Sequence, residues 1–202
     1  MVSLVPIVEG QGEIEAVPVL LRKVVSEMEA FDIKIERPFR VKRNRVVQSG
    51  EIERAVRLAV NDRSQVGGIL VILDADDDCP ARLGPELLKR CQRSIPGIPV
   101  AVVLAQREFE SWFLGSKESL RGIRGIRKDA ISPNYPEEIR GAKERLTKNM
   151  EQNRYLSVDD QPAFAEHIDL QITRQRCPSF DKFMRDVTKL IADMRLYIHA
   201  HV

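Results

Sequence analysis

The chain has 202 residues, of which 43% are hydrophobic and 31% are charged. This composition is too apolar for a disordered chain and too charged for a membrane core, and no apolar run approaches the roughly 20 residues of a spanning helix. Lys and Arg number 32 against 30 Asp and Glu, so with a net charge of +2 any binding partner has to be sought through local clusters. No basic stretch precedes the first apolar residues, which predicts a cytoplasmic protein without an export signal.

Strand and helix signals alternate through the first half of the chain. The apolar patterns predict strands at 2–8, 31–39, 69–73 and 98–105, and helices at 14–28, 52–60 and 85–91. The runs at 69–73 and 98–105 are apolar throughout, which is typical of parallel strands buried on both faces. This alternation predicts an α/β fold with a Rossmann-like parallel central sheet flanked by helices.

The strand signals stop at Phe109, and the later patterns predict helices at 137–150, 162–175 and 180–197. We therefore predict an α/β core over residues 1–115 and a mainly helical C-terminal extension over residues 116–202, packed on that core.

Acidic residues follow three of the predicted strands. Because ligands bind beyond the carboxyl ends of parallel strands, we expect these carboxylates to lie together at one edge of the sheet. A cluster of oxygen ligands selects a hard cation, either Mg²⁺ or Mn²⁺. Gly10 lets another group approach closely beside the first of these acids. The candidate metal ligands are Glu9, Glu13, Asp74, Asp76, Asp78, Glu108 and Glu110.

Some of these acids also fit structural roles. Glu13 opens a helix, where a negative charge is favourable at the positive end of the helix dipole. Asp78 belongs to an acidic loop of the kind that is often simply solvated. Glu9 closes an apolar strand, where an acid is uncommon without a functional reason, and it is the strongest of the candidates.

The motif Glu9-Gly10 after the first strand, together with Asp74-x-Asp76 after the third, resembles the Toprim domain of topoisomerases, bacterial primases and OLD-family nucleases. This resemblance implies that Glu9 is a general acid/base and that Asp74 and Asp76 hold Mg²⁺. A narrower group, small bacterial Toprim-like proteins often encoded beside an SMC/RecF-type ATPase, is similar over nearly the whole chain. The motifs that carry this wider similarity are 8–13, 74–77, 107–112, 141–143, 160–162 and 179–180.

Two basic segments are candidates for binding phosphates. The first segment lies within residues 37–45 and contains no acid. The second segment lies within residues 121–128 and is interrupted by glycines that permit close backbone approach. A charged strand edge that guards against aggregation is the alternative for the first segment. Phe109 and Trp112 are aromatic residues that could stack on a base, but core packing is the expected role for both. The candidate nucleic-acid-binding residues are Arg40, Lys42, Arg43, Arg45, Arg121, Arg124 and Arg127.

These patterns predict a Mg²⁺- or Mn²⁺-dependent nuclease of Toprim type that acts on nucleic acid. The neighbouring ATPase of the similar proteins implies a role in DNA repair or phage defence. Two alternatives stay open: a non-catalytic Toprim-like module that docks on an ATPase, and a small-molecule phosphoesterase. The chain offers little surface for gripping DNA, which favours an ATPase partner or a homodimer.

Overall fold

The computed structural model describes residues 1–61, 63 and 65–199, and the side chains of residues 43, 44, 198 and 199 lie outside that description. Within these residues, five strands form one parallel sheet in the order β2-β1-β4-β5, and β3 pairs with β1 beyond the end of β2. The strands are β1 (Val2–Val8), β2 (Ile33–Ile35), β3 (Phe39–Arg40), β4 (Val66–Asp74) and β5 (Val100–Ala105). The predicted α/β class with a Rossmann-like parallel sheet is confirmed.

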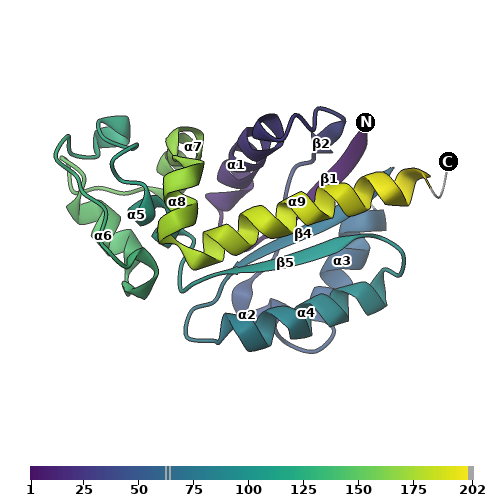
Figure 1. The fold of residues 1–202 in the computed structure, drawn as a ribbon. Coiled ribbons are helices and arrows are strands. Elements are labelled where there is room, and N and C mark those ends of the chain that lie inside the picture. The colour runs from purple at the N-terminus through teal and green to yellow at the C-terminus, as the bar shows by residue number, and fades with distance from the viewer. Residues whose placement is uncertain (62, 64, 200–202) are drawn as a thin grey trace.

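Helices cover both faces of the sheet (Figure 1). The helices α1 (Glu13–Glu27) and α9 (Pro178–His199) lie on one face, and α3 (Glu51–Asn61) and α4 (Pro80–Ser94) lie on the other. Alternate residues of β4 enter two separate hydrophobic clusters, with Leu70 and Ile72 on the α1 and α9 side. Because side chains of a strand alternate between its faces, Asp74 lies on that same side, next to the start of α1.

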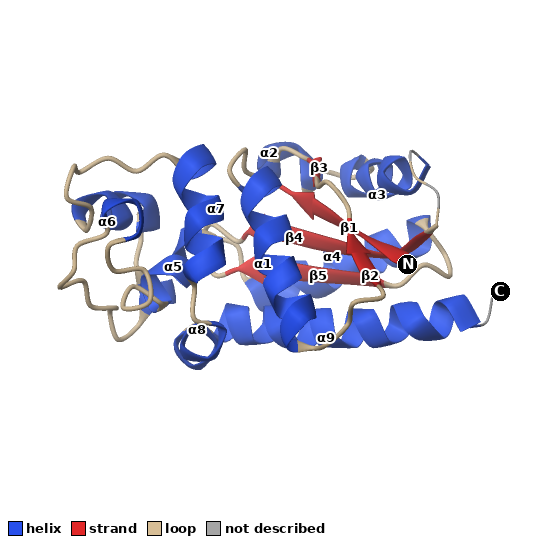
Figure 2. Ribbon diagram, turned by 90° about the horizontal axis from the view of Figure 1, so that it is seen from above, coloured by secondary structure: helices blue, strands red, loops and turns tan. Residues whose placement is uncertain are grey.

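The shorter helices include a group that lies beyond the carboxyl ends of the strands. Figure 2 shows α5 (Glu110–Gly115) and α7 (Ser157–His167) near the ends of β4 and β5, with α6 (Ala142–Lys148) farther out. One hydrophobic cluster joins the sheet to this group, since it contains Leu70 of β4 together with Phe113 of α5 and Phe164 of α7. The remaining elements are α2 (Arg43–Val46), α8 (Leu170–Arg176) and the 3₁₀ turns at Ile123–Gly125 and Pro136–Glu138.

Three predicted elements are interrupted in the structure. The predicted strand at 31–39 is two short strands, because Pro38 has no backbone N–H for a continuous ladder. The predicted helix at 137–150 starts only at Ala142, since Gly141 takes a left-handed conformation with φ of 68°. The predicted helix at 162–175 is divided between α7 and α8 at Asp169, whose side chain caps α8 by accepting from the Ile172 N–H.

None of the helices in the described part of the chain combines the length and the hydropathy that crossing a membrane requires.

Candidate acidic active site

Four carboxylates come together where the strands end. Glu9 follows β1, Glu13 opens α1, Asp74 ends β4, and Glu110 opens α5 after β5. Three of them are buried, with exposed fractions of 4% for Glu13, 9% for Asp74 and 1% for Glu110, and Glu9 is half-buried. We call Glu9, Glu13, Asp74 and Glu110 the acidic cluster.

Backbone groups of the surrounding loops position two of these side chains. The Glu9 N–H donates to Oε2 of Glu13 over 3.2 Å, and the Phe109 N–H donates to Oδ1 of Asp74 over 2.7 Å. A Cβ atom at Gly10 would lie 2.5 Å from Oε1 of Glu13, so any other residue here would require this carboxylate to shift. The close approach expected at Gly10 is thus confirmed, and the approaching group is Glu13.

Burial and mutual repulsion favour the protonated forms of the buried acids. Burial raises the pKa of Glu13 to about 7, and the charges of Glu110 and Glu9 act in the same direction. Burial likewise raises the pKa of Asp74 well above its usual range, with further contributions from Glu13, Glu110 and Glu9. Burial also raises the pKa of Glu110. The carboxylates therefore lie within electrostatic reach of one another.

The helical part of the chain supplies polar partners to Glu110. Gln161 of α7 donates through Nε2 to Oε1 of Glu110 over 2.8 Å, and the Tyr155 hydroxyl donates to the same oxygen over 3.1 Å. Nζ of Lys143, in α6, lies 3.8 Å from Oε1 of Glu110. Burial tends to lower the pKa of Lys143, but attraction to Glu110 and Asp74 outweighs it, so the net pKa is raised and the lysine stays cationic.

Sequence reasoning assigned no role to these three partners. The only signal for Lys143 and Gln161 was their place in the motifs at 141–143 and 160–162, and Tyr155 lies outside every motif. Their contacts with Glu110 depend on how the helices pack against the sheet. The spacing of residues along the sequence does not predict this packing.

The other predicted metal ligands lie outside the acidic cluster. Asp76 and Asp78 are exposed in the loop after β4, where Asp76 takes a left-handed conformation with φ of 51°. The Asp76 N–H donates to the carbonyl oxygen of Arg107 over 2.9 Å. Glu108 accepts from the N–H groups of Ala142 and Lys143, at 3.0 and 3.4 Å, and so stabilises the start of α6.

The acidic cluster fits a hard divalent cation by donor type, because all of its ligands are carboxylate oxygens. Among the described residues, however, no group of three or more His, Cys, Asp and Glu side chains is arranged to hold a metal ion. Cation binding would therefore require these carboxylates to draw together and to lose the protons that burial favours.

The first basic segment borders the acidic cluster. Nε of Arg40, in β3, donates to the carbonyl oxygen of Glu9 over 3.0 Å. Arg40, Lys42 and Arg45 are exposed and, with Arg54, line a groove of about 210 Å³. The predicted contact through Arg43 falls on a side chain outside the described residues.

The second basic segment lies in the helical part, and two of its arginines are engaged there. Nε of Arg121 donates to the Ala130 carbonyl oxygen, and Nε of Arg124 donates to Asp160, both over 2.8 Å. Arg127 is exposed.

Phe109 and Trp112 lie in the hydrophobic core. Both are fully buried, with their ring centroids 4.9 Å apart. The expected core role of these two residues is confirmed, and neither ring is available to a base.

The fold and the site define a parallel α/β protein with an acidic cluster at the carboxyl edge of its sheet. Residues 8–188 match a family described as a domain of unknown function, DUF4276, and the chain belongs to this family. The matched range contains all four carboxylates and their three partners. No curated protein and no solved structure matches the chain. The Toprim resemblance stays a prediction.

Proposed function

We propose that the chain is a divalent-metal-dependent phosphodiesterase that cleaves nucleic acid. The observation that carries the proposal is the convergence of the acidic cluster at the carboxyl edge of a parallel sheet, the edge at which such folds bind their ligands. Four carboxylates face one lysine, so once the buried acids lose their protons the site has an excess of negative charge that a cation would offset. The Toprim resemblance supports the same function.

The extent to which each carboxylate of the acidic cluster is buried indicates its role. Glu13, Asp74 and Glu110 are the most deeply buried and would hold Mg²⁺ or Mn²⁺, which when bound polarises a phosphate and lowers the pKa of an attacking water. Glu9 is less deeply buried than the other three, and it would act as the general acid/base. Gln161 and Tyr155 orient Glu110 through their hydrogen bonds.

The basic groove beside the site supports nucleic acid as the substrate. Arg40, Lys42 and Arg45 line it, and Arg40 contacts the backbone of Glu9 directly. A phosphate that binds Arg40 would lie next to Glu9. An SMC/RecF-type ATPase partner or a homodimer remains part of the proposal, because the groove is small.

The second candidate is a non-catalytic module that docks on an ATPase. One observation favours it: within the described residues, the acidic side chains are not arranged to hold an ion. A module of this kind would keep the fold and the buried carboxylates without binding a metal.

Two substitutions and a matched control separate these functions. Asp74→Asn removes a buried charge that the cation needs, so it should abolish both Mn²⁺ binding and cleavage. Glu9→Gln should retain Mn²⁺ binding and lose cleavage, because proton transfer fails. Asp78→Asn, which changes an exposed acid of the adjacent loop, should retain both. The measurements are calorimetric titration with Mn²⁺ and a nuclease assay, each with and without an ATPase partner.

The same measurements on the wild-type protein distinguish the proposed phosphodiesterase from the docking module. If it binds no Mn²⁺ at millimolar concentration, the metal-dependent function is wrong and the docking module takes its place. If it binds Mn²⁺ but cleaves neither DNA nor RNA, the substrate is a small phosphate ester.

A further inference from the structure

The loop at residues 128–136 exposes two large apolar side chains. Ile131 is 67% exposed and Tyr135 is 68% exposed. Leaving large apolar surface in water is unfavourable, so the exposure of both side chains is a reason to look for a ligand at this loop. Within the described ranges, the Tyr135 side chain makes no hydrogen bond and no ring contact, and most of its surface is open to solvent.

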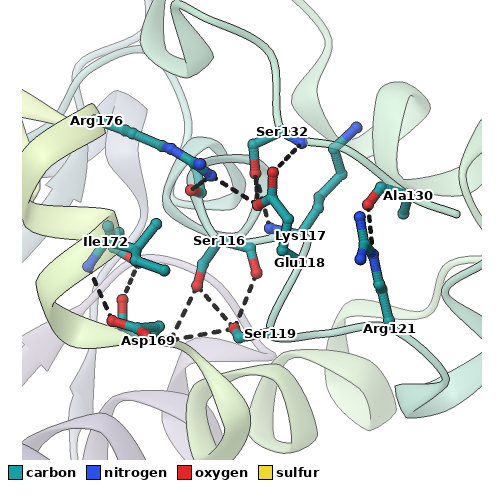
Figure 3. Close-up of polar contacts among 12 residues, drawn as sticks. Ser116, Lys117, Glu118, Ser119, Arg121, Ala130, Ser132, Asp169, Ile172 and Arg176 are labelled. Carbon is teal, nitrogen blue, oxygen red and sulfur yellow. Dashed lines mark hydrogen bonds and ion pairs between the residues drawn. The ribbon is translucent and has the colours of Figure 1, made fainter. Parts of the chain in front are cut away.

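Polar contacts hold the loop in place instead (Figure 3). Glu118 accepts from the Ser132 N–H over 3.0 Å and from the Ser132 hydroxyl over 2.6 Å. Nη1 of Arg176 donates to the same carboxylate over 2.6 Å, and Nε of Arg121 donates to the Ala130 carbonyl oxygen over 2.8 Å. Because these contacts order the backbone, a ligand would meet a preorganised surface and lose little entropy on ordering it.

The charge around the loop is suited to phosphates. Residues 119–136 contain four basic residues and one acid, Asp129, and they are followed by the buried Glu137 and the exposed Glu138. Arg124 is paired with Asp160, whereas Arg127 and Lys128 are exposed and form no ion pair within the described ranges.

The chain leads from this loop to the acidic cluster. Five residues beyond Tyr135, Arg140 lies 2.8 Å from Asp77 in the loop after β4. Three residues further on, Lys143 lies 3.8 Å from Glu110. Residues 135–143 therefore connect the loop to a side chain that contacts the acidic cluster.

We infer that the loop at 128–136 binds single-stranded nucleic acid, with Tyr135 stacking on an unpaired base and Arg127 and Lys128 contacting phosphates. An exposed ring on a basic surface is the usual means of binding unpaired bases, whereas the bases of a duplex are already stacked. Phe109 and Trp112 are buried, whereas the Tyr135 ring is exposed and follows the second basic segment in the sequence. The inference rests on the proposed function and deepens it, because it names the form of the substrate.

The test is fluorescence anisotropy with a short labelled single-stranded DNA and with the matching duplex, both in EDTA so that binding is measured without cleavage. The wild type should bind the single strand more tightly than the duplex. Tyr135→Ala should weaken single-strand binding by about 5- to 150-fold and leave duplex binding unchanged. Tyr135→Phe, which keeps the ring, should bind like the wild type.

Phe31→Ala is the matched control, because Phe31 is an aromatic residue that is 69% exposed between α1 and β2. It should leave single-strand binding unchanged. Equal losses from Phe31→Ala and Tyr135→Ala, or no loss from Tyr135→Ala, would overturn the inference. A wild-type protein that does not bind single-stranded DNA would also overturn the inference. The exposed loop would then be a surface for a protein partner. A wild type that binds single strands through Tyr135 but cleaves nothing with Mn²⁺ supports this inference and removes the proposed nuclease function.

Discussion

Glu13 and Asp74 favour their protonated forms at pH values where surface carboxylates are ionised, because both are buried beside other carboxylates. A divalent cation would compete with these protons for the same oxygen atoms. Metal binding to the acidic cluster should therefore release protons, and the affinity should rise with pH through neutrality.

The stability of the metal-free protein should fall as the pH rises from about 4.5 to about 7. The pKa of Glu13 is raised in the folded state from 4.5 to about 7, so in this window the folded protein holds a proton that the unfolded chain releases. The loss reaches about 3 kcal/mol in the free energy of unfolding at neutral pH. Asp74 and Glu110, whose pKa values are also raised, contribute with the same sign.

Urea unfolding near pH 5 and near pH 8, in EDTA, measures this dependence. Glu13→Gln removes the titrating group and should flatten the profile relative to the wild type. A profile equally steep in the variant would show that Glu13 is not the group responsible. Added Mn²⁺ should restore stability to the wild type at the higher pH.

At the scale of elements, the contact between α1 and α7 positions one side of the site. A Cβ atom at Gly12 would collide with Oε1 of Gln161 and with the backbone carbonyl of Ser157. The φ of Gly12 is −68°, which any residue adopts, so glycine is required here by the close packing alone. Gln161 in turn holds Glu110, so this contact connects helix packing with the acidic cluster.

Gly12→Ala should destabilise the protein by about 1–3 kcal/mol, because α7 has to move away from α1. Gly84→Ala, inside α4 with open space around the new methyl group, should instead stabilise it by about 0.5–1 kcal/mol. Chemical denaturation of both variants measures the difference. Similar free energies of unfolding for the two would show that α1 and α7 are not in close contact.

Many of the helices and strands could be predicted from the sequence, because the spacing of apolar residues reflects which face of each element is buried. The strand predicted at 2–8 is β1, and the helix predicted at 14–28 is α1 shifted by one residue. Some errors are displaced ends: the helix predicted at 85–91 is α4, which starts at Pro80. Three others fall where a single residue interrupts a favourable pattern, at Pro38, Gly141 and Asp169. Each acts through its own backbone or capping chemistry, which a periodic pattern does not register.

The site was predictable only in part. Glu9 and Asp74 could be found because each ends an apolar strand, and parallel strands end at one edge. Asp76 was expected beside Asp74 but lies exposed in the loop. The role of Gln161 could not be found, because it contacts Glu110 across 51 residues of sequence and only the packing of α7 brings them together.

At the scale of the whole molecule, the acidic cluster lies between the ends of the strands and the helical part, which supplies the contacts to Glu110. Glu9, Glu13, Asp74 and Glu110 precede residue 116, whereas Lys143, Tyr155 and Gln161 follow it. Neither residues 1–115 nor residues 116–202 alone contain both the four carboxylates and their three partners. The predicted boundary at residue 115 would therefore divide the site, and the two parts have to pack together for it to form.

The most direct test of this account is an anomalous-scattering map from crystals grown with Mn²⁺. The account predicts a peak in contact with Asp74 and with at least one of Glu13 and Glu110, after these carboxylates have drawn together. A peak held by Asp76 and Asp78 in the exposed loop, or no peak at millimolar Mn²⁺, would contradict it.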